Sequence, residues 1–339
     1  MPSKRLDVSS RMTHTLTHFR PDSVPLRAYG LVLLAGGLWS LGGIIVREIE
    51  VATQWQLLFY RSVALAVTLF GFLAARRRGH VMRTFQAAGG AGIVAGMCLA
   101  ASFICFIFSI THTTVANTLF LLSSAPFLSA ALGRILLGEQ IRSSMWAIMS
   151  VAFIGIALMV WESLGAGHLF GDLTGLGAAL GFSGFTVALR RGKTVEMLPA
   201  ICLAGIFGAL VAGAIALPLE NGLVIPWHDV LLCVLYGGAV LGLGLIMYTA
   251  GSRYVAAAEL TLLSLTEVVL GPIWVWLSIG EVPGGMTLLG GMILLGAITG
   301  LAIHGSQKGN EIVKAASGYG SDRLVENSQP IRPGPLGLP

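Results

Sequence analysis

The chain has 339 residues, of which 11% are charged and 55% hydrophobic, with a formal net charge of +5 at pH 7. A soluble domain carries about 25% charged residues, so this composition excludes an ordinary water-soluble protein. In a bilayer, backbone polar groups must be satisfied inside helices or a closed barrel. Long apolar runs such as 230–250, rather than short alternating strands, predict an all-α membrane protein.

Ten apolar segments follow one another along the chain. Each approaches the length of about 20 residues that a helix needs to cross about 30 Å of hydrocarbon. In order they are 28–46, 55–75, 86–109, 115–137, 145–161, 173–189, 197–219, 230–250, 255–279 and 287–304. The first 27 residues form a polar, basic N-terminal segment. The tail 305–339 is rich in Gly, Ser and Pro and is predicted to be disordered.

The basic residues predict the orientation of these helices. Cytoplasmic connectors of membrane proteins carry an excess of Lys and Arg. With the N-terminus in the cytoplasm, nearly all of the 21 basic residues fall in cytoplasmic segments. The exceptions are Arg47, in an outer connector, and Arg61 and Arg134, within helices. We therefore predict ten transmembrane helices with both termini in the cytoplasm.

The two halves of the chain are related to each other. A constant shift pairs the first five segments with the last five, and it places Gly138-Glu139 on Gly280-Glu281, each at the end of a fourth helix. Because five is an odd number, the second unit enters the membrane from the opposite side. We predict two inverted five-helix repeats, over 28–162 and 171–304. Such repeats are a recurrent design of secondary transporters, whose substrate sites lie near the bilayer midplane.

Short motifs occur in the order and spacing of a known transporter family. They are Trp39, Phe59-Tyr60-Arg61-Ser62, Ser124-Ala125-Pro126-Phe127 leading to Leu137-Gly138-Glu139, Gly171-Asp172, and Leu265-Thr266-Glu267-Val268 leading to Ile279-Gly280-Glu281. On these motifs, residues 28–304 resemble the EamA-like branch of the drug/metabolite transporter (DMT) superfamily. The resemblance implies two EamA-like halves in a bacterial cytoplasmic (inner) membrane and metabolite efflux.

The sequence departs from the family pattern at two places. The family often has Glu-Pro in the ninth helix, whereas here Val268 follows Glu267 and the proline comes later, at Pro272. The duplicate of Arg61 is Leu203, so the two halves are not chemically equivalent.

Two ionisable residues inside predicted helices are candidates for substrate binding or coupling. A charged side chain in hydrocarbon costs at least about 2.5–3.5 kcal/mol, so each needs a partner, water or a proton. Glu267, midway along the ninth helix, could exchange protons during transport or make a structural hydrogen bond. Arg61, in the second helix, could bind a substrate carboxylate, pair with Glu267 or reach the outer interface. Together they fit a zwitterion such as an amino acid.

Further polar and aromatic residues could line the same site. Glu259 and Thr266 share the ninth helix with Glu267, and the repeat relation places Asn117 and Ser124 at corresponding positions of the fourth helix. Each could instead be solvated at an interface or bonded to its own backbone. Trp39 could stack on a planar or cationic ligand or fill the core.

Two prolines are candidate hinges. Pro126 and Pro272 fall within predicted helices, where a proline removes a backbone hydrogen bond and promotes a kink. Such kinks suit a transporter site, and they also occur in helices without that role.

The predicted function is a secondary transporter of a small organic metabolite, an amino acid or similar solute, working as an exporter by alternating access, with proton coupling left open. The alternatives are a structural or receptor-like bundle and a membrane-embedded enzyme. An enzyme needs a nucleophile with a base, or a metal cluster; neither HExxH nor GxSxG occurs. We therefore predict no catalytic residue, no cofactor, no metal and no nucleic-acid partner. A monomer and a homodimer both fit.

Overall fold

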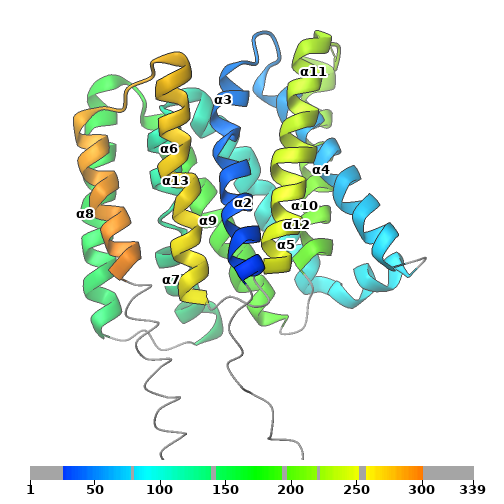
Figure 1. Cartoon of the computed structure of the whole chain (residues 1–339), viewed down its shortest axis with the longest axis horizontal. Helices are drawn as coiled ribbons and strands as arrows, with labels where there is room; N and C mark the ends of the chain where they lie inside the picture. Colours follow the sequence, from blue (N-terminus) through cyan, green and yellow to red (C-terminus); the bar gives the residue numbers. More distant parts are fainter. Residues whose placement is uncertain are drawn as a thin grey trace, which may run out of the picture.

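The structure, a computed structural model, describes residues 26–77, 80–138, 143–192, 197–219, 222–251 and 257–300, and these residues form helices and no strands (Figure 1). Most of the N-terminal segment 1–27 and the whole tail 305–339 lie outside the described residues. So does Glu139, one member of the duplicated Gly-Glu pair.

The helices run up and down between the two ends of one bundle (Figure 1). In chain order they are α2 (Leu26–Ser40), α3 (Gly42–Arg47), α4 (Gln54–Arg77), α5 (Val81–His112), α6 (Val115–Leu122), α7 (Ala125–Leu137), α8 (Ser143–Ala166), α9 (Leu169–Arg191), α10 (Met197–Leu219), α11 (Trp227–Val234), the π-helical stretch η1 (Leu235–Leu243), α12 (Gly244–Gly251) and α13 (Ala257–Ile279). A further helix covers Gly285–Gly300.

Within the described residues, seven helical segments are long and apolar enough to cross a membrane. They include Arg27–Arg47, Val115–Leu137 and Trp227–Gly251, each of which contains more than one of the helices above. Three further apolar helices are shorter: Trp146–Glu162, Thr266–Ile279 and Gly285–Gly300. The helical membrane fold is thus confirmed, whereas ten crossings in two inverted repeats stay a prediction.

Several expected helices are interrupted. The first segment breaks at Leu41, between α2 and α3, and the fourth breaks at Ser123 and Ser124, between α6 and α7. We expected a kink at Pro126, but Pro126 instead lies in the first turn of the new helix α7. A proline fits that turn because its missing N–H has no partner there in any case. Pro272 lies inside the continuous helix α13, as predicted.

The duplicated glycines end their helices in the same way. Gly138 follows α7 with φ 70°, and Gly280 follows α13 with φ 75°. This left-handed conformation is costly for residues with a Cβ, and glycine is its usual occupant just past a helix C-terminus. The backbone conformation by itself therefore favours glycine at both positions.

The helices of the two predicted repeats interlock. α5 packs along α9 and α10, α4 along α10 and η1, and α2 along α12 and α13. Small residues permit close approach: a Cβ at Gly96 of α5 would lie 3.1 Å from the carbonyl oxygen of Ala200 in α10, and a Cβ at Gly181 of α9 would lie 2.8 Å from the backbone nitrogen of Ser102 in α5. The most extensive contacts thus join the first repeat to the second.

The closest crossing lies between α4 and η1. A Cβ at Gly237 would collide with the carbonyl oxygen of Arg61 and lie 2.9 Å from the Cα of the same residue. Because these are backbone atoms, no side-chain movement could make room. Only glycine lets η1 reach α4 at this position.

We expect Gly237→Ala to destabilise the protein by about 1–3 kcal/mol, the usual cost of overpacking, and to lower the unfolding temperature measured in detergent. Gly71→Ala is the matched control, because Gly71 lies in α4 and its Cβ would meet nothing within 4 Å. That variant should match the unchanged protein or gain up to about 1 kcal/mol in helix propensity. Equal unfolding temperatures for Gly237→Ala and the unchanged protein would show that the close crossing is unnecessary.

Candidate functional site

Arg61 is the largest fully buried side chain in the described part of the chain, with 1% of its surface exposed. It lies in α4, about two turns and roughly 10 Å from Gln54. Its Cζ atom is 4.9 Å from the ring centre of Phe103 in α5 and 5.2 Å from that of Tyr236 in η1. These are cation–π distances. Two aromatic rings from different helices therefore hold the guanidinium group.

The Nε and Nη2 atoms of Arg61 are buried and have no hydrogen-bond partner among the described residues. No acidic side chain in that part of the chain forms an ion pair with Arg61. The sequence left open whether Arg61 pairs with Glu267, and in this conformation it does not. Leaving a charged donor unpaired away from water is costly, so these atoms need a partner other than the described residues.

Tyr236 links this arginine to the neighbouring helices. A Cβ at Gly42 of α3 would lie 2.9 Å from the Cε2 atom of the Tyr236 ring, so the ring packs flush against α3. The same ring contacts Arg61, and the charges of Arg61 and Glu267 both act on its hydroxyl group. Tyr236 was not among the residues we expected at the site. The only sequence signal was an aromatic residue beside two glycines.

Trp39 lies on α2, close to the start of α12. Its indole ring packs over Gly244 and stands 5.4 Å from the ring of Tyr248. Its Nε1 atom is buried without a hydrogen-bond partner among the described residues. Trp39 thus packs against the core, as one of our two alternatives expected, but it also carries an unused donor.

Glu267 lies near the middle of α13, which packs along α2. A Cβ at Gly36 of α2 would lie 3.7 Å from the backbone nitrogen of Glu267 and 3.3 Å from the Cβ of Thr266. Among the described residues, Glu267 forms no ion pair. Thr266 is half-buried beside it. The side chain of Glu259 lies outside the described residues.

Asn117 and Ser124 lie elsewhere. The Asn117 side-chain nitrogen donates to Thr113 Oγ1 at 3.1 Å and to Asp172 Oδ1 of α9. Ser124 Oγ donates to the carbonyl oxygen of Leu121, 2.6 Å away in its own chain segment. Neither contacts Arg61 or Glu267 in the described part of the chain, so their place in a common site remains a prediction.

A small hollow beside Ser124 does not suit an organic solute. Its volume of about 20 Å³ is close to that of a single water molecule. The residues around it are almost all apolar and come from the α6–α7 junction, α8 and α9: Ser124, Phe127, Leu128, Ala152, Phe153, Ile156 and Leu176.

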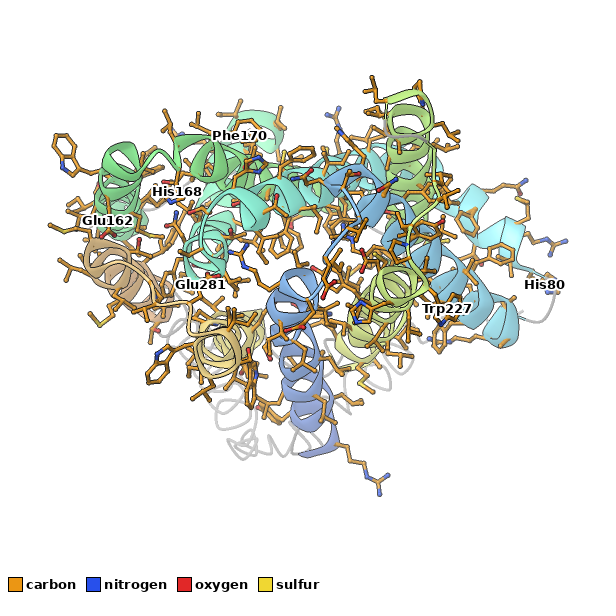
Figure 2. The ribbon with its side chains drawn as sticks, turned by 90° about the horizontal axis from the view of Figure 1, so that it is seen from above. His80, Glu162, His168, Phe170, Trp227 and Glu281 are labelled. Carbon is orange, nitrogen blue, oxygen red and sulfur yellow. The ribbon has the colours of Figure 1, made fainter. Side chains whose placement is uncertain are left out.

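The upper end of the bundle carries an ion pair that we did not predict. Arg47 Nε, at the end of α3, lies 2.8 Å from Glu281 Oε2, and Arg47 Nη2 donates to the carbonyl oxygen of Thr113 at 2.8 Å. Glu281 Oε1 accepts the backbone N–H of Val115 at 2.7 Å. Seen from above, Glu281 lies between α6, α13 and α3 (Figure 2). We call the Arg47–Glu281–Val115 contacts the upper latch.

Two more carboxylates bind backbone N–H groups at the same end. Glu162 Oε2 accepts from Thr287 at 2.6 Å, in the first turn of the last described helix, to which it lies adjacent in Figure 2. Asp229 Oδ2, which is buried, accepts from Val51 at 2.9 Å and Ala52 at 2.7 Å. Acidic side chains thus satisfy the donors that open each of these segments.

The comparisons with known proteins agree with this architecture. Two curated relatives, both described as pseudopaline exporter CntI and from two strains of Pseudomonas aeruginosa, are 25% and 24% identical to the chain over 290 residues, which is 82% of this chain and 96% of each relative. A solved crystal structure of a protein shares the fold with a TM-score of 0.55 at 18% identity, covering 80% of this chain and 94% of the other.

The family model described as the EamA-like transporter family matches the chain twice, over residues 26–161 and 169–303. The two matches cover nearly all of the described helices, and they confirm the resemblance that the sequence motifs carried. The chain therefore belongs to the EamA-like transporter family.

Proposed function

We propose that this chain is a secondary exporter, which moves a small organic solute across the bacterial cytoplasmic membrane by alternating access. The observation that carries the proposal is the family match over two consecutive segments of similar length. The relatives described as exporters, aligned over 96% of their length, support the outward direction. Membership of a transporter family also favours transport over the alternatives of an enzyme or a structural bundle.

The proposal includes ten membrane crossings in two inverted five-helix repeats, over 28–162 and 171–304. The two family matches begin and end close to these bounds. The left-handed conformation at both Gly138 and Gly280 supports the correspondence between the fourth helix of each repeat. Alternating access in such proteins is largely the movement of one set of helices against the other around a fixed site.

The distribution of arginines supports placing both termini in the cytoplasm. Arg27 begins the first helical segment, Arg76 and Arg77 end α4, and Arg191 ends α9; all of these helix ends lie at the lower end of the bundle in Figure 1. Arg47 lies at the upper end, where it is paired with Glu281. By the positive-inside rule, the lower end is cytoplasmic.

We place the transport site between Arg61, Tyr236, Trp39 and Glu267. These side chains come from α4, η1, α2 and α13, so both repeats contribute to the site. Arg61 and Glu267 carry opposite charges and do not pair, which fits a solute with both signs of charge, such as an amino acid. The named cargo of the relatives makes pseudopaline the first compound to test.

Glu267 is the residue through which we propose proton coupling. A carboxylate inside the membrane without a cationic partner is costly when ionised. It can alternate between a protonated, uncharged form and an ionised form that binds a cationic group of the solute. Exchange between these forms would link solute movement to a proton gradient.

The upper latch supports an outer gate. Arg47 belongs to the first repeat, Glu281 to the second, and the latch ties α3, α6 and the end of α13 together. With the lower end cytoplasmic, these contacts close the outer side. Release of a solute outward requires that they separate.

The transport proposal predicts that inverted membrane vesicles containing the protein accumulate pseudopaline or amino acids when a pH gradient is imposed. Glu267→Gln should abolish this accumulation and leave exchange of solute down its own gradient, because the amide cannot release a proton. The amount of radiolabelled solute trapped in the vesicles measures both the accumulation and the exchange. Glu48→Gln, at an exposed carboxylate beyond α3, is the matched control and should behave as the unchanged protein.

If no compound in the panel moves in either direction, the proposed function is wrong. If solutes move but Glu267→Gln still accumulates them against a gradient, the protein is a transporter that does not use Glu267 for protons.

The outer gate predicts that Glu281→Ala exposes the interior from the upper side. In a chain that keeps Cys233, which is fully buried in α11, and lacks the other three cysteines, a membrane-impermeant maleimide reports this opening. Loss of hydrogen bonds to a charged group costs about 2 kcal/mol, which corresponds to roughly 30-fold faster labelling, since 1.4 kcal/mol is a factor of ten. Glu48→Ala should label at the original rate, and equal rates for both variants would rule out the gate.

A further inference from the structure

The two unpartnered nitrogens of Arg61 lie on the same edge of its guanidinium group. Nε–H and the adjacent Nη2–H point in nearly parallel directions, which is the arrangement that binds the two oxygens of a carboxylate side by side. Both atoms are buried and lack a partner among the described residues. Most buried polar groups are satisfied, so an open pair of donors at such an edge calls for a specific explanation.

The neighbouring side chains fix the plane of the Arg61 guanidinium group but do not accept hydrogen bonds from this edge among the described residues. Phe103 and Tyr236 contact the guanidinium through their rings, and the Tyr236 hydroxyl also hydrogen-bonds to Arg61, yet Nε and Nη2 have no partner among the described residues. The backbone of Arg61 is held by its close crossing with Gly237. The guanidinium group of Arg61 is therefore positioned before a ligand arrives, which lowers the entropic cost of binding.

Among the described residues, no acidic side chain fills this edge. Asp229, the acidic residue near the outer end of α11, binds the backbone N–H groups of Val51 and Ala52. Glu267 forms no ion pair with Arg61 in the described part of the chain. The edge thus offers two N–H donors and a positive charge, and no anion among the described residues is bound to it.

We propose that the Nε–Nη2 edge of Arg61 binds the carboxylate of the transported solute, so that the protein selects carboxylate-bearing solutes over their neutral amides. The inference rests on the proposed function. It adds the chemical class of the solute and the residue that recognises it. A single arginine balances one negative charge, which fits a carboxylate better than a doubly charged phosphate group.

The test compares matched ligands on the purified full-length chain. Each L-amino acid of a panel, together with pseudopaline, is assayed for binding by thermal unfolding and for flux in proteoliposomes. The same assays are run with the corresponding carboxamides and with aminoalkyl phosphonates. A ligand present at a hundredfold excess over its dissociation constant produces a readily measured rise in the unfolding temperature. We expect at least one carboxylate to bind about 10- to 100-fold more tightly than its amide.

Three variants assign that preference to Arg61. Arg61→Gln should bind the carboxylate and the amide with similar affinity. Arg61→Lys, which keeps the charge and loses the planar fork, should retain only part of the preference. Arg76→Gln removes an exposed arginine from the same helix and should leave the preference unchanged. The ratio of the affinities for carboxylate and amide is measured within each variant. A general loss of stability would therefore not by itself remove the preference.

The outcomes separate this inference from the proposed function. Flux that does not distinguish carboxylates from amides, or a preference that survives in Arg61→Gln, overturns the inference and leaves the exporter standing. Carboxylate binding that depends on Arg61 without any flux supports the site and refutes export. Tighter binding of phosphonates than of carboxylates overturns the assignment to carboxylates, and so does a panel in which no carboxylate raises the unfolding temperature.

Discussion

A positive charge enclosed by aromatic rings, with no acidic side chain paired with it among the described residues, constrains the centre of this protein. Arg61 is held by Phe103 and Tyr236, while the edge of its guanidinium stays unpaired. The π-helical stretch η1 provides both Tyr236 and the glycine that lets the backbone of α4 come close. Short π-helices occur frequently at functional sites, and here the irregular turn places an aromatic ring against the arginine.

The acidic residues at the upper end have a different role, which is to accept hydrogen bonds from backbone N–H groups. Helices that begin near a membrane surface expose N–H groups that have no partner within the helix. Glu281 satisfies one at the start of α6, Glu162 one at the start of the last described helix, and Asp229 two in the connection between α3 and α4. Each contact joins segments far apart in the chain. The same carboxylates that cap backbone groups therefore also join the first half of the chain to the second.

The sequence predicted the helices well because apolar length and basic connectors depend on composition alone. Residues 197–219 match α10, and the prediction 55–75 lies within α4. The breaks at Leu41 and between Leu122 and Ala125 were not predicted, since hydropathy does not register a backbone turn inside an apolar run. Arg61 and Glu267 stood out because charge is rare in such segments. Tyr236 and the upper latch did not, because their roles depend on packing between helices that the sequence keeps far apart.

The interlocking of the two halves has a consequence for how the chain is made. Arg61 leaves the ribosome well before Tyr236 and Gly237, and at about 5–20 residues per second the interval is on the order of ten seconds or more. During that time α4 enters the bilayer with an arginine whose aromatic neighbour in η1 does not yet exist. Arg61 lies only about two turns from the start of α4, so its long side chain can reach the interfacial water until the second half of the chain is made. The contact between Arg61 and Tyr236 thus forms late in biogenesis, after η1 has been synthesised.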